Sequence, residues 1–263
     1  MMRSLWTAAS GMVAQQLNID VISNNLANVN TTGFKKNRAE FEDLMYQNLK
    51  IAGSITGTGG DQQIPVGIQV GMGVRALSVA KEFSQGDYQN TNNPLDLAVE
   101  GDGFFLVQVN GEDMYTRAGA FKLNQDGTVV TANGYVLQPE FTVPLETKNI
   151  VVTENGHISA LDNMGQELAG ADIPLYTFIN PAGLIAKGRN IYSVSEASGE
   201  AQEGVPGEDN TGTIAQGFLE MSNVEVVDEM VNMIVGQRAY EMNSKAIQTS
   251  DSMLQTAIQL KRS

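Results

Sequence analysis

The sequence contains no cysteine among its 263 residues. This absence excludes disulfides, thiol nucleophiles and cysteine metal sites, and it suits a protein that crosses or occupies an oxidising compartment. Histidine occurs once, as His157, directly after an Asn-Gly turn sequence. A zinc site or a nucleophile triad therefore has too few parts. We expect His157 to be a solvent-facing strand residue, and we expect no metal and no cofactor.

Basic residues are also scarce, because 16 Lys and Arg stand against 30 Asp and Glu, for a formal net charge of −14. The few cations are scattered along the chain, which disfavours a nucleic-acid or anionic-membrane surface. No apolar run approaches the roughly 18 residues that span a bilayer, so no membrane insertion is expected. The length allows two or three compact units.

A heptad pattern stands near the start of the chain. Its mostly apolar members recur at alternating steps of three and four: Leu5, Ala8, Met12, Gln15, Ile19, Ile22, Leu26 and Val29. The pattern predicts a helix from about Arg3 to Asn28 that exits through the asparagine-rich stretch before Gly33. A helix on the order of 40 Å long with one narrow apolar stripe is not stable alone, so we expect it to pair with another helix.

The other long helical pattern lies at residues 222–262. One apolar row repeats every seven residues: Val226, Met233, Tyr240, Ile247 and Leu254. A second row follows steps of three and four: Val235, Ala239, Met242, Ala246, Thr249, Met253, Ala257 and Leu260. Two adjacent rows indicate contact with more than one neighbour, although a helix in an ordinary core is equally compatible with them.

The start of this helix carries capping signals. Ser222 or Asn223 can serve as the N-cap, and Glu225 stands three residues after Ser222 as in a capping box. Asp228 and Glu229 suit the positive end of the helix. We therefore expect the helix to begin directly after Ser222 or Asn223.

The sequence in the middle of the chain predicts short strands joined by tight turns. Four turn dipeptides are flanked by β-branched or aromatic residues: Asn110-Gly111, Asp126-Gly127, Asn133-Gly134 and Asn155-Gly156. Such dipeptides favour hairpins. Before them, Ile64, Val66, Ile68, Val70 and Met72 alternate with other residues in a Gly-rich segment, which predicts a one-faced strand.

These patterns predict an α+β fold, with long N- and C-terminal helices pairing as a coiled-coil-like domain and a β-rich body of short strands and hairpins between them. Residues 1–33 and 222–263 form the predicted helical domain. Residues 34–94 form a connecting region that includes the Gly-rich segment 48–73, and residues 95–221 form the outer β-rich domain. A subunit that offers a helical seam at each end favours head-to-tail assembly into a helical homopolymer.

The acidic residues raise an alternative hypothesis, that the protein is an enzyme with a catalytic pair of carboxylates. Candidates for a glycosidase acid pair are Asp96, Glu100 and Asp102, or Glu112 and Asp113. An envelope glycan hydrolase would use a pair such as Asp96 and Asp102. Most of the acidic residues, however, stand in or beside turn sequences, where Asp serves local hydrogen bonding. The residues give no catalytic set, and a secreted adhesin with a coiled-coil stalk is disfavoured because the heptads are split between the two termini.

The segment RSLWTAASGMVA resembles a short signal peptide, with one positive charge before small and apolar residues. The heptad register passes through it into Ile19 and Val29, so cleavage there would destroy the amphipathic pattern. We expect export, if it occurs, without a cleaved signal peptide.

The two ends of the chain also resemble a known family. SNNLANVNTTGFKKNRAEFEDLMYQ and SNVEVVDEMVNMIVGQRAYEMNSKAI look like the terminal signatures of the bacterial flagellar rod and hook family. NPLDLAVEGDGFF, YTRAGAF, NGYVLQP and FINPAGL resemble family segments in the expected order. The resemblance covers essentially the whole chain and is greatest to subunits of the distal rod; the proximal rod and the hook are the close alternatives.

The resemblance implies a non-enzymatic structural subunit of the flagellar basal body, in the periplasm of the cell envelope. It implies export by the flagellar type III apparatus and polymerisation into a straight, rigid tube that carries torque to the hook and encloses the export channel. The implied partners are other copies of the chain, proximal rod subunits, hook subunits and ring proteins. The Gly-rich segment after FEDLMYQ implies a stiffening element, in which we place Ile64, Val66, Ile68 and Val70.

Overall fold

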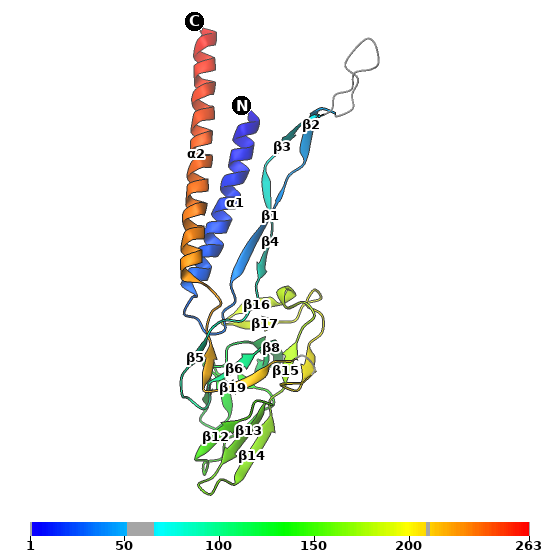
Figure 1. Cartoon of the computed structure of the whole chain (residues 1–263), viewed down its shortest axis with the longest axis vertical. Helices are drawn as coiled ribbons and strands as arrows, with labels where there is room; N and C mark the ends of the chain where they lie inside the picture. The colour runs from blue at the N-terminus through cyan, green and yellow to red at the C-terminus, as the bar shows by residue number, and fades with distance from the viewer. Residues whose placement is uncertain (1, 52–65, 209–210, 263) are drawn as a thin grey trace. The chain divides into compact units, whose positions relative to one another are not determined.

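The computed structural model describes residues 2–51, 66–208 and 211–262 (Figure 1). They form two compact units, each built from segments far apart in the sequence. The first unit contains the described parts of Met1–Leu26, Asn37–Ala80 and Val226–Ser263, and the second contains Ala27–Lys36 and Lys81–Glu225. Terminal helices and a β-rich central body are both present, which confirms the predicted α+β class.

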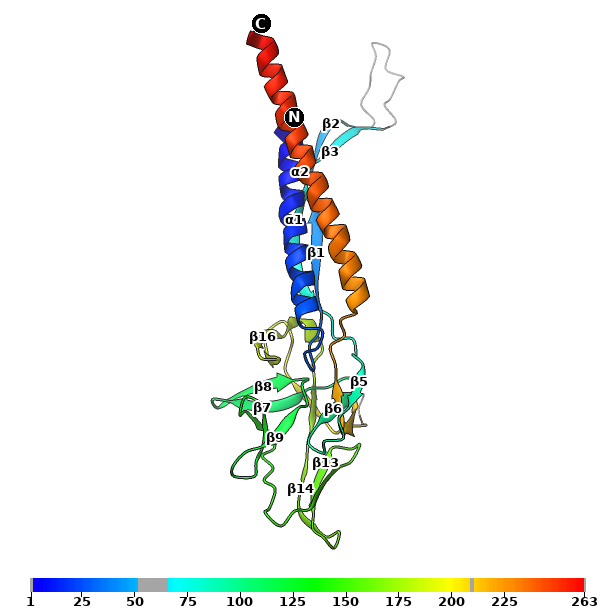
Figure 2. The same cartoon turned by 90° about the vertical axis from the view of Figure 1, so that its left-hand side faces the viewer.

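The first unit contains both long helices, α1 (Met2–Ala27) and α2 (Val226–Arg262). They lie side by side and run antiparallel in both views (Figures 1 and 2). The predicted exit of α1 is confirmed, because the chain leaves the helix after Ala27 and Gly33 adopts a φ of +68°. A side chain at Gly33 would also meet the backbone of Ala118, so two constraints favour glycine there.

The predicted cap of α2 is wrong, since the helix begins at Val226, three residues beyond Asn223. The Asn223 side chain is instead used in the second unit, where its Oδ1 accepts a hydrogen bond from Lys36 N at 2.7 Å and its Nδ2 donates to Glu82 O at 2.9 Å. The Ser222 hydroxyl accepts a hydrogen bond from Val224 N. These contacts between segments occupy the side chains that local sequence rules assign to the helix.

Four strands complete the described part of the first unit. β1 (Asn37–Asp43) pairs with β4 (Val74–Lys81). β2 (Tyr46–Lys50) pairs antiparallel with β3 (Ile68–Gly71), with Tyr46 opposite Gly71. The strand predicted from the alternation after residue 64 is therefore confirmed over β3, while Ile64 lies outside the described residues.

The largest sheet of the second unit has seven strands in the order β16-β17-β8-β7-β11-β10-β9. Hairpins join neighbours at the predicted turns. Between β7 and β8, Asn110 and Gly111 both have positive φ, of 53° and 87°, as a type I′ turn requires. The strands are β7 (Phe105–Val109), β8 (Glu112–Thr116), β9 (Phe121–Leu123), β10 (Val129–Thr131), β11 (Val136–Leu137), β16 (Ile185–Gly188) and β17 (Ile191–Ser193).

Smaller sheets surround this one. Three strands form the order β12-β13-β14, and the remaining strands form the pairs β15-β18, β19-β6 and β20-β5. A short 3₁₀ helix, η1 (Pro181–Gly183), precedes β16. The strands are β5 (Tyr88–Asn90), β6 (Leu97–Glu100), β12 (Asn149–Val152), β13 (His157–Leu161), β14 (Glu167–Asp172), β15 (Leu175–Thr177), β18 (Gln202–Gly204), β19 (Thr213–Gln216) and β20 (Phe218–Glu220).

The core of the second unit is apolar and joins these sheets. Phe105 and Phe121 pack edge to face with ring centroids 5.4 Å apart, surrounded by buried aliphatic side chains such as Val99 and Leu175. A second cluster centres on Phe104, Tyr115, Leu184 and Tyr192. The unit therefore has its own hydrophobic core, as an independently stable domain requires.

Candidate functional site

Small and polar residues form several of the contacts between α1 and α2. The Ser4 and Ser250 hydroxyls lie 3.2 Å apart, and Asn25 Nδ2 lies 3.5 Å from Glu229 Oε2. Between these two contacts, a side chain added at Gly11 or Gly236 would touch the facing helix, meeting Asn243 in one case and Ile19 in the other. The backbones approach closely because glycine stands at these positions.

We call these contacts together the polar seam; its members are Ser4, Gly11, Asn25, Glu229, Gly236, Asn243 and Ser250. On α2 the four members follow one another at steps of seven, which is the period of a coiled-coil contact. Small and polar residues at that period escape a search for apolar rows. A search for any residue class repeating at seven would have found them.

The residues of the predicted apolar rows differ in burial between the two helices. On α1, Ala8 and Ile22 are buried. The other predicted members on α1 are half-buried: Leu5, Met12, Gln15, Ile19 and Leu26. Val29 is also half-buried and lies in the turn beyond the end of α1. On α2, Met233, Ile247 and Leu254 are half-buried, whereas five members are exposed: Val226, Tyr240, Met242, Ala246 and Met253.

An apolar stripe remains uncovered near the start of α2. Its members are Val227, Met230, Val231, Ile234 and Val235, and each side chain is more than half exposed. Their spacing of i, i+3, i+4, i+7 and i+8 places them on one helix face. On α1, Met2, Trp6 and Val13 are at least 70% exposed. Large apolar side chains gathered on one exposed face indicate an interaction surface.

A buried ion cluster lies inside the second unit. Lys35 Nζ lies 2.7 Å from Glu220 Oε1, and Arg117 Nε lies 2.6 Å from Glu220 Oε2. The three side chains are at most 5% exposed. Burial by itself raises the pKa of Glu220, but the charges of Arg117 and Lys35 outweigh it and hold that pKa below its usual range. Burial lowers the pKa of Lys35 despite its attraction to Glu220.

The ion cluster ties together segments that are distant in the sequence. Arg117 also donates to the carbonyls of Gly101 and Gly103, and Lys35 Nζ donates to Ser84 O at 2.8 Å. Gly86 N donates to Glu220 Oε1 at 3.1 Å. Because most donors of the two cations are already used, the arrangement fits a structural role better than a catalytic one.

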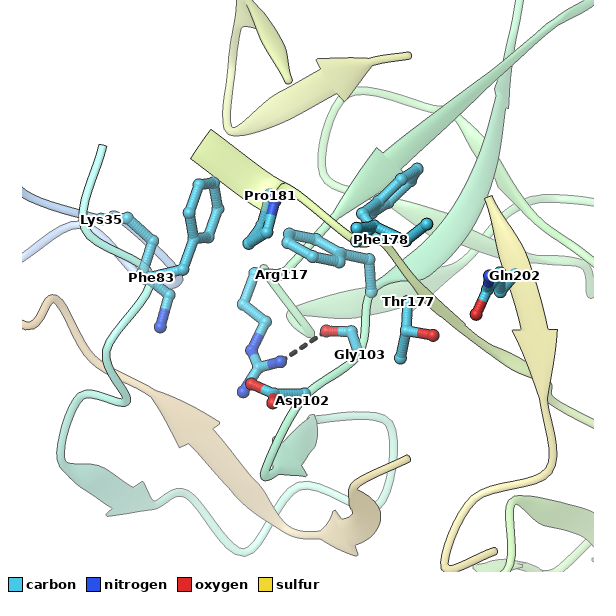
Figure 3. Close-up of a pocket in the computed structure, with 11 residues that line it drawn as sticks. Lys35, Phe83, Asp102, Gly103, Arg117, Thr177, Phe178, Pro181 and Gln202 are labelled. Carbon is cyan, nitrogen blue, oxygen red and sulfur yellow. Dashed lines mark hydrogen bonds between the residues drawn. The ribbon is translucent and has the colours of Figure 1, made fainter. Parts of the chain in front are cut away.

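A cavity of about 400 Å³ opens beside the ion cluster (Figure 3). Lys35 and Arg117 line it, together with aromatic side chains such as Phe83 and Phe178. Asp102 lies close to the Arg117 guanidinium and is exposed. The predicted partner of Asp102 in a hydrolase, Asp96, is used locally, because it accepts a hydrogen bond from Asn93 Nδ2 at 3.0 Å.

His157 is the first residue of β13, and its side chain is 42% exposed. Its ring nitrogens contact Asp172 Oδ1 at 2.6 Å and Glu167 Oε1 at 3.2 Å. The hydrogen bonds to Asp172 and Glu167 raise the pKa of His157. These partners face His157 from the neighbouring strand β14, and no local sequence signal predicts the contact.

Within residues 2–51, 66–208 and 211–262, no group of three His, Asp or Glu side chains is arranged to hold a metal ion. In the same ranges, no helix combines the length and the apolar character needed to cross a bilayer.

Comparison with known proteins decides between a structural subunit and a hydrolase. Three family models match: flagella basal body rod protein at residues 5–35, flagellar hook protein FlgE/F/G D1 domain at 98–160, and flagellar basal body rod FlgEFG protein C-terminal at 215–260. The flagellar basal-body rod protein FlgG of Borreliella burgdorferi is 49% identical, with all of both chains covered.

The chain belongs to the flagellar basal-body rod protein family. FlgG of Caulobacter vibrioides is 47% identical over 99% of this chain and all of its own, and FlgG of Bacillus subtilis is 41% identical over all of both chains. The rod subunit is a structural subunit of the distal rod in the flagellar basal body, not an enzyme. This excludes the glycan hydrolase alternative.

Proposed function

We propose that the rod subunit polymerises head to tail through its terminal helices into a straight, rigid helical tube. The observation that carries the proposal is the apolar stripe of α2, since α1 covers the polar seam and leaves the stripe exposed. Val226, Tyr240, Met242, Ala246 and Met253 are further exposed apolar or small positions for contact between copies. The helical segments 1–33 and 222–263 serve as the polymerisation domain, and residues 95–221 form the outer domain.

The tube encloses part of the export channel and transmits motor torque to the hook. Its partners are proximal rod subunits, hook subunits and ring proteins. The subunit reaches its site in the periplasm through the flagellar type III export apparatus without a cleaved signal peptide. Support for this part comes from the family relationship and from the absence of cysteine, which prevents cross-linking in an oxidising compartment.

The segment around β2 and β3 stiffens the tube. Val66 and Ile68 are exposed, and so are Met45 and Leu49 beside and on the partner strand β2. Val70 is half-buried. A pair of strands with exposed apolar side chains is marginal by itself and gains stability by packing on another surface. We place that surface on a neighbouring copy.

The proposal is tested by changing the stripe without changing the polar seam. Ile234→Asp places a charge in the centre of the stripe, where an assembled contact would bury it unpaired. We expect this variant to remain a folded monomer at concentrations at which the wild-type chain forms polymers in analytical ultracentrifugation. The matched control is Gln125→Asp, an exposed position of the second unit that belongs to neither helix and should polymerise as the wild type does. Equal polymerisation of both variants would contradict the proposal.

A further inference from the structure

A cavity of about 260 Å³ lies in the first unit, among residues of α1, β1 and α2. Its wall combines amide side chains with one carboxylate. The asparagines that line it are Asn18, Asn25, Asn37 and Asn232, and the carboxylate is that of Glu229. Val235 of the apolar stripe also lines the cavity, so the cavity and the stripe are continuous.

Glu229 is 9% exposed, and few hydrogen bonds offset the cost of burying its charge. Within the described part of the chain, its carboxylate accepts one hydrogen bond, from Asn25 Nδ2 at the long distance of 3.5 Å. The Asn25 amide is already committed to the backbone of Asn37, because Nδ2 donates to Asn37 O at 2.8 Å and Oδ1 accepts from Asn37 N at 2.9 Å. The hydrogen bond to Glu229 is therefore secondary.

A buried carboxylate is expected to be paired with a cation. The positive end of the α2 dipole offsets part of the cost, since Glu229 lies in the first turn. Arg38 is the one cation among the residues that line the cavity. The Arg38 guanidinium pairs with Glu40 at 3.3 Å, and the side chain is 67% exposed. Its charge is therefore directed to Glu40 and solvent, not to Glu229.

We propose that the Glu229 cavity receives a basic side chain from a second copy of this chain. The inference rests on the proposed polymerisation and adds a specific polar contact to it. Charge complementarity supports a second copy as the source. Arg3, Arg238 and Lys245 are exposed on the two helices, and none of them forms an ion pair with any residue that the structure describes.

The contact would fix how copies dock on the stripe. Apolar surfaces slide against one another with little loss of energy, whereas a charged pair in a cavity holds one register. The Asn-rich wall suits a Lys or Arg head, because amide oxygens accept its remaining donors.

The first test separates folding from assembly in the full chain. Glu229→Gln removes a charge that the single subunit leaves nearly unpaired, so the melting temperature of the monomer should stay the same or rise. The critical concentration for polymerisation should rise roughly 10- to 100-fold, because a charge-assisted hydrogen bond between copies is lost. Asp228→Asn is the matched control, since Asp228 is exposed in the same helical turn, and it should change neither quantity.

Three outcomes would overturn the inference. Unchanged polymerisation of Glu229→Gln would contradict the inference while leaving the proposed function intact. A variant Arg38→Gln that reproduces the defect would assign the partner of Glu229 to its own chain. A wild-type chain that never polymerises would remove the proposed function, and the inference with it.

A charge exchange identifies the donor. Glu229→Arg should block polymerisation, and combining it with Arg3→Glu, Arg238→Glu or Lys245→Glu should restore polymerisation in the variant that reverses the true partner. Failure of all three combinations, with each chain folded by circular dichroism, would contradict a helical donor from a second copy.

Discussion

Ser4 and Ser250 stand 246 positions apart in the sequence, yet their hydroxyls lie 3.2 Å apart where α1 and α2 meet. This contact is one end of a polar seam whose other end is the pair Asn25 and Glu229. Small and polar residues supply these contacts within the chain, and the apolar stripe of α2 remains exposed. The seam therefore separates the surface that folds the subunit from the surface proposed to assemble it.

Because the helices approach closely at the polar seam, we expect a larger side chain at Gly236 to destabilise the helix pair. A side chain there meets Ile19 at once, since even a β-carbon would lie 3.2 Å from Ile19 Cγ1. Gly236→Leu should lower the free energy of unfolding of the helix pair by about 1–3 kcal/mol, the usual cost of overpacking. Thermal melting followed by circular dichroism measures it. Gln237→Leu adds the same side chain at an exposed position, without the close contact to Ile19, and should cost less than Gly236→Leu.

The ion cluster predicts that Glu220 makes a large and pH-dependent contribution to the stability of the folded protein. Glu220→Gln leaves Lys35 and Arg117 buried without their carboxylate, so unfolding should become easier by about 3–5 kcal/mol. The pKa of Glu220 is lowered in the folded protein, so its stabilisation is present above the unfolded pKa near 4.5 and is lost as the pH falls through the folded pKa. Urea titrations from pH 3 to 7 measure both effects.

In those titrations, Glu220→Gln should flatten the acid limb of the stability curve. Asp102→Asn is a suitable control because Asp102 is exposed and lies beside the same cations. An equal loss of stability in the two variants would contradict the role assigned to the buried carboxylate.

The pairing of His157 predicts a raised pKa that can be measured directly. Hydrogen bonds to Asp172 and Glu167 favour the charged ring, so its stabilisation is present below pH 6.5 and is lost as the pH rises through the folded pKa. A proton NMR titration follows the only histidine of the chain without assignment. The folded pKa should exceed 6.5. Asp172→Asn should lower it more than Glu167→Gln does, since the Asp172 contact is shorter.

Deletion of residues 48–66 tests the stiffening element. The deletion removes the end of β2 and the segment that precedes β3, while leaving α1 and α2 intact. We expect the shortened chain to polymerise into curved or irregular tubes in electron micrographs. Straight tubes from the deletion variant would assign stiffness to another part of the subunit.

Much of the fold could be predicted from the sequence because its signals are local. Heptad spacing marked α1 and α2 within a few residues, and the Asn110-Gly111 turn lies between its two strands. The ion cluster had no local signal, since Lys35 and Glu220 are separated by 185 positions. The polar seam was hidden for another reason. Its contacts depend on the small size of Gly11 and Gly236, which a count of apolar residues ignores.

Assembly through the terminal helices can be tested by electron microscopy of the purified, concentrated wild-type chain. We expect straight tubes, formed without any other protein, because the helices of each copy offer exposed apolar surfaces to the next. Curved tubes would contradict the proposed rigidity. A chain that stays a folded monomer, with α1 and α2 ordered at every concentration tested, would contradict assembly through the terminal helices.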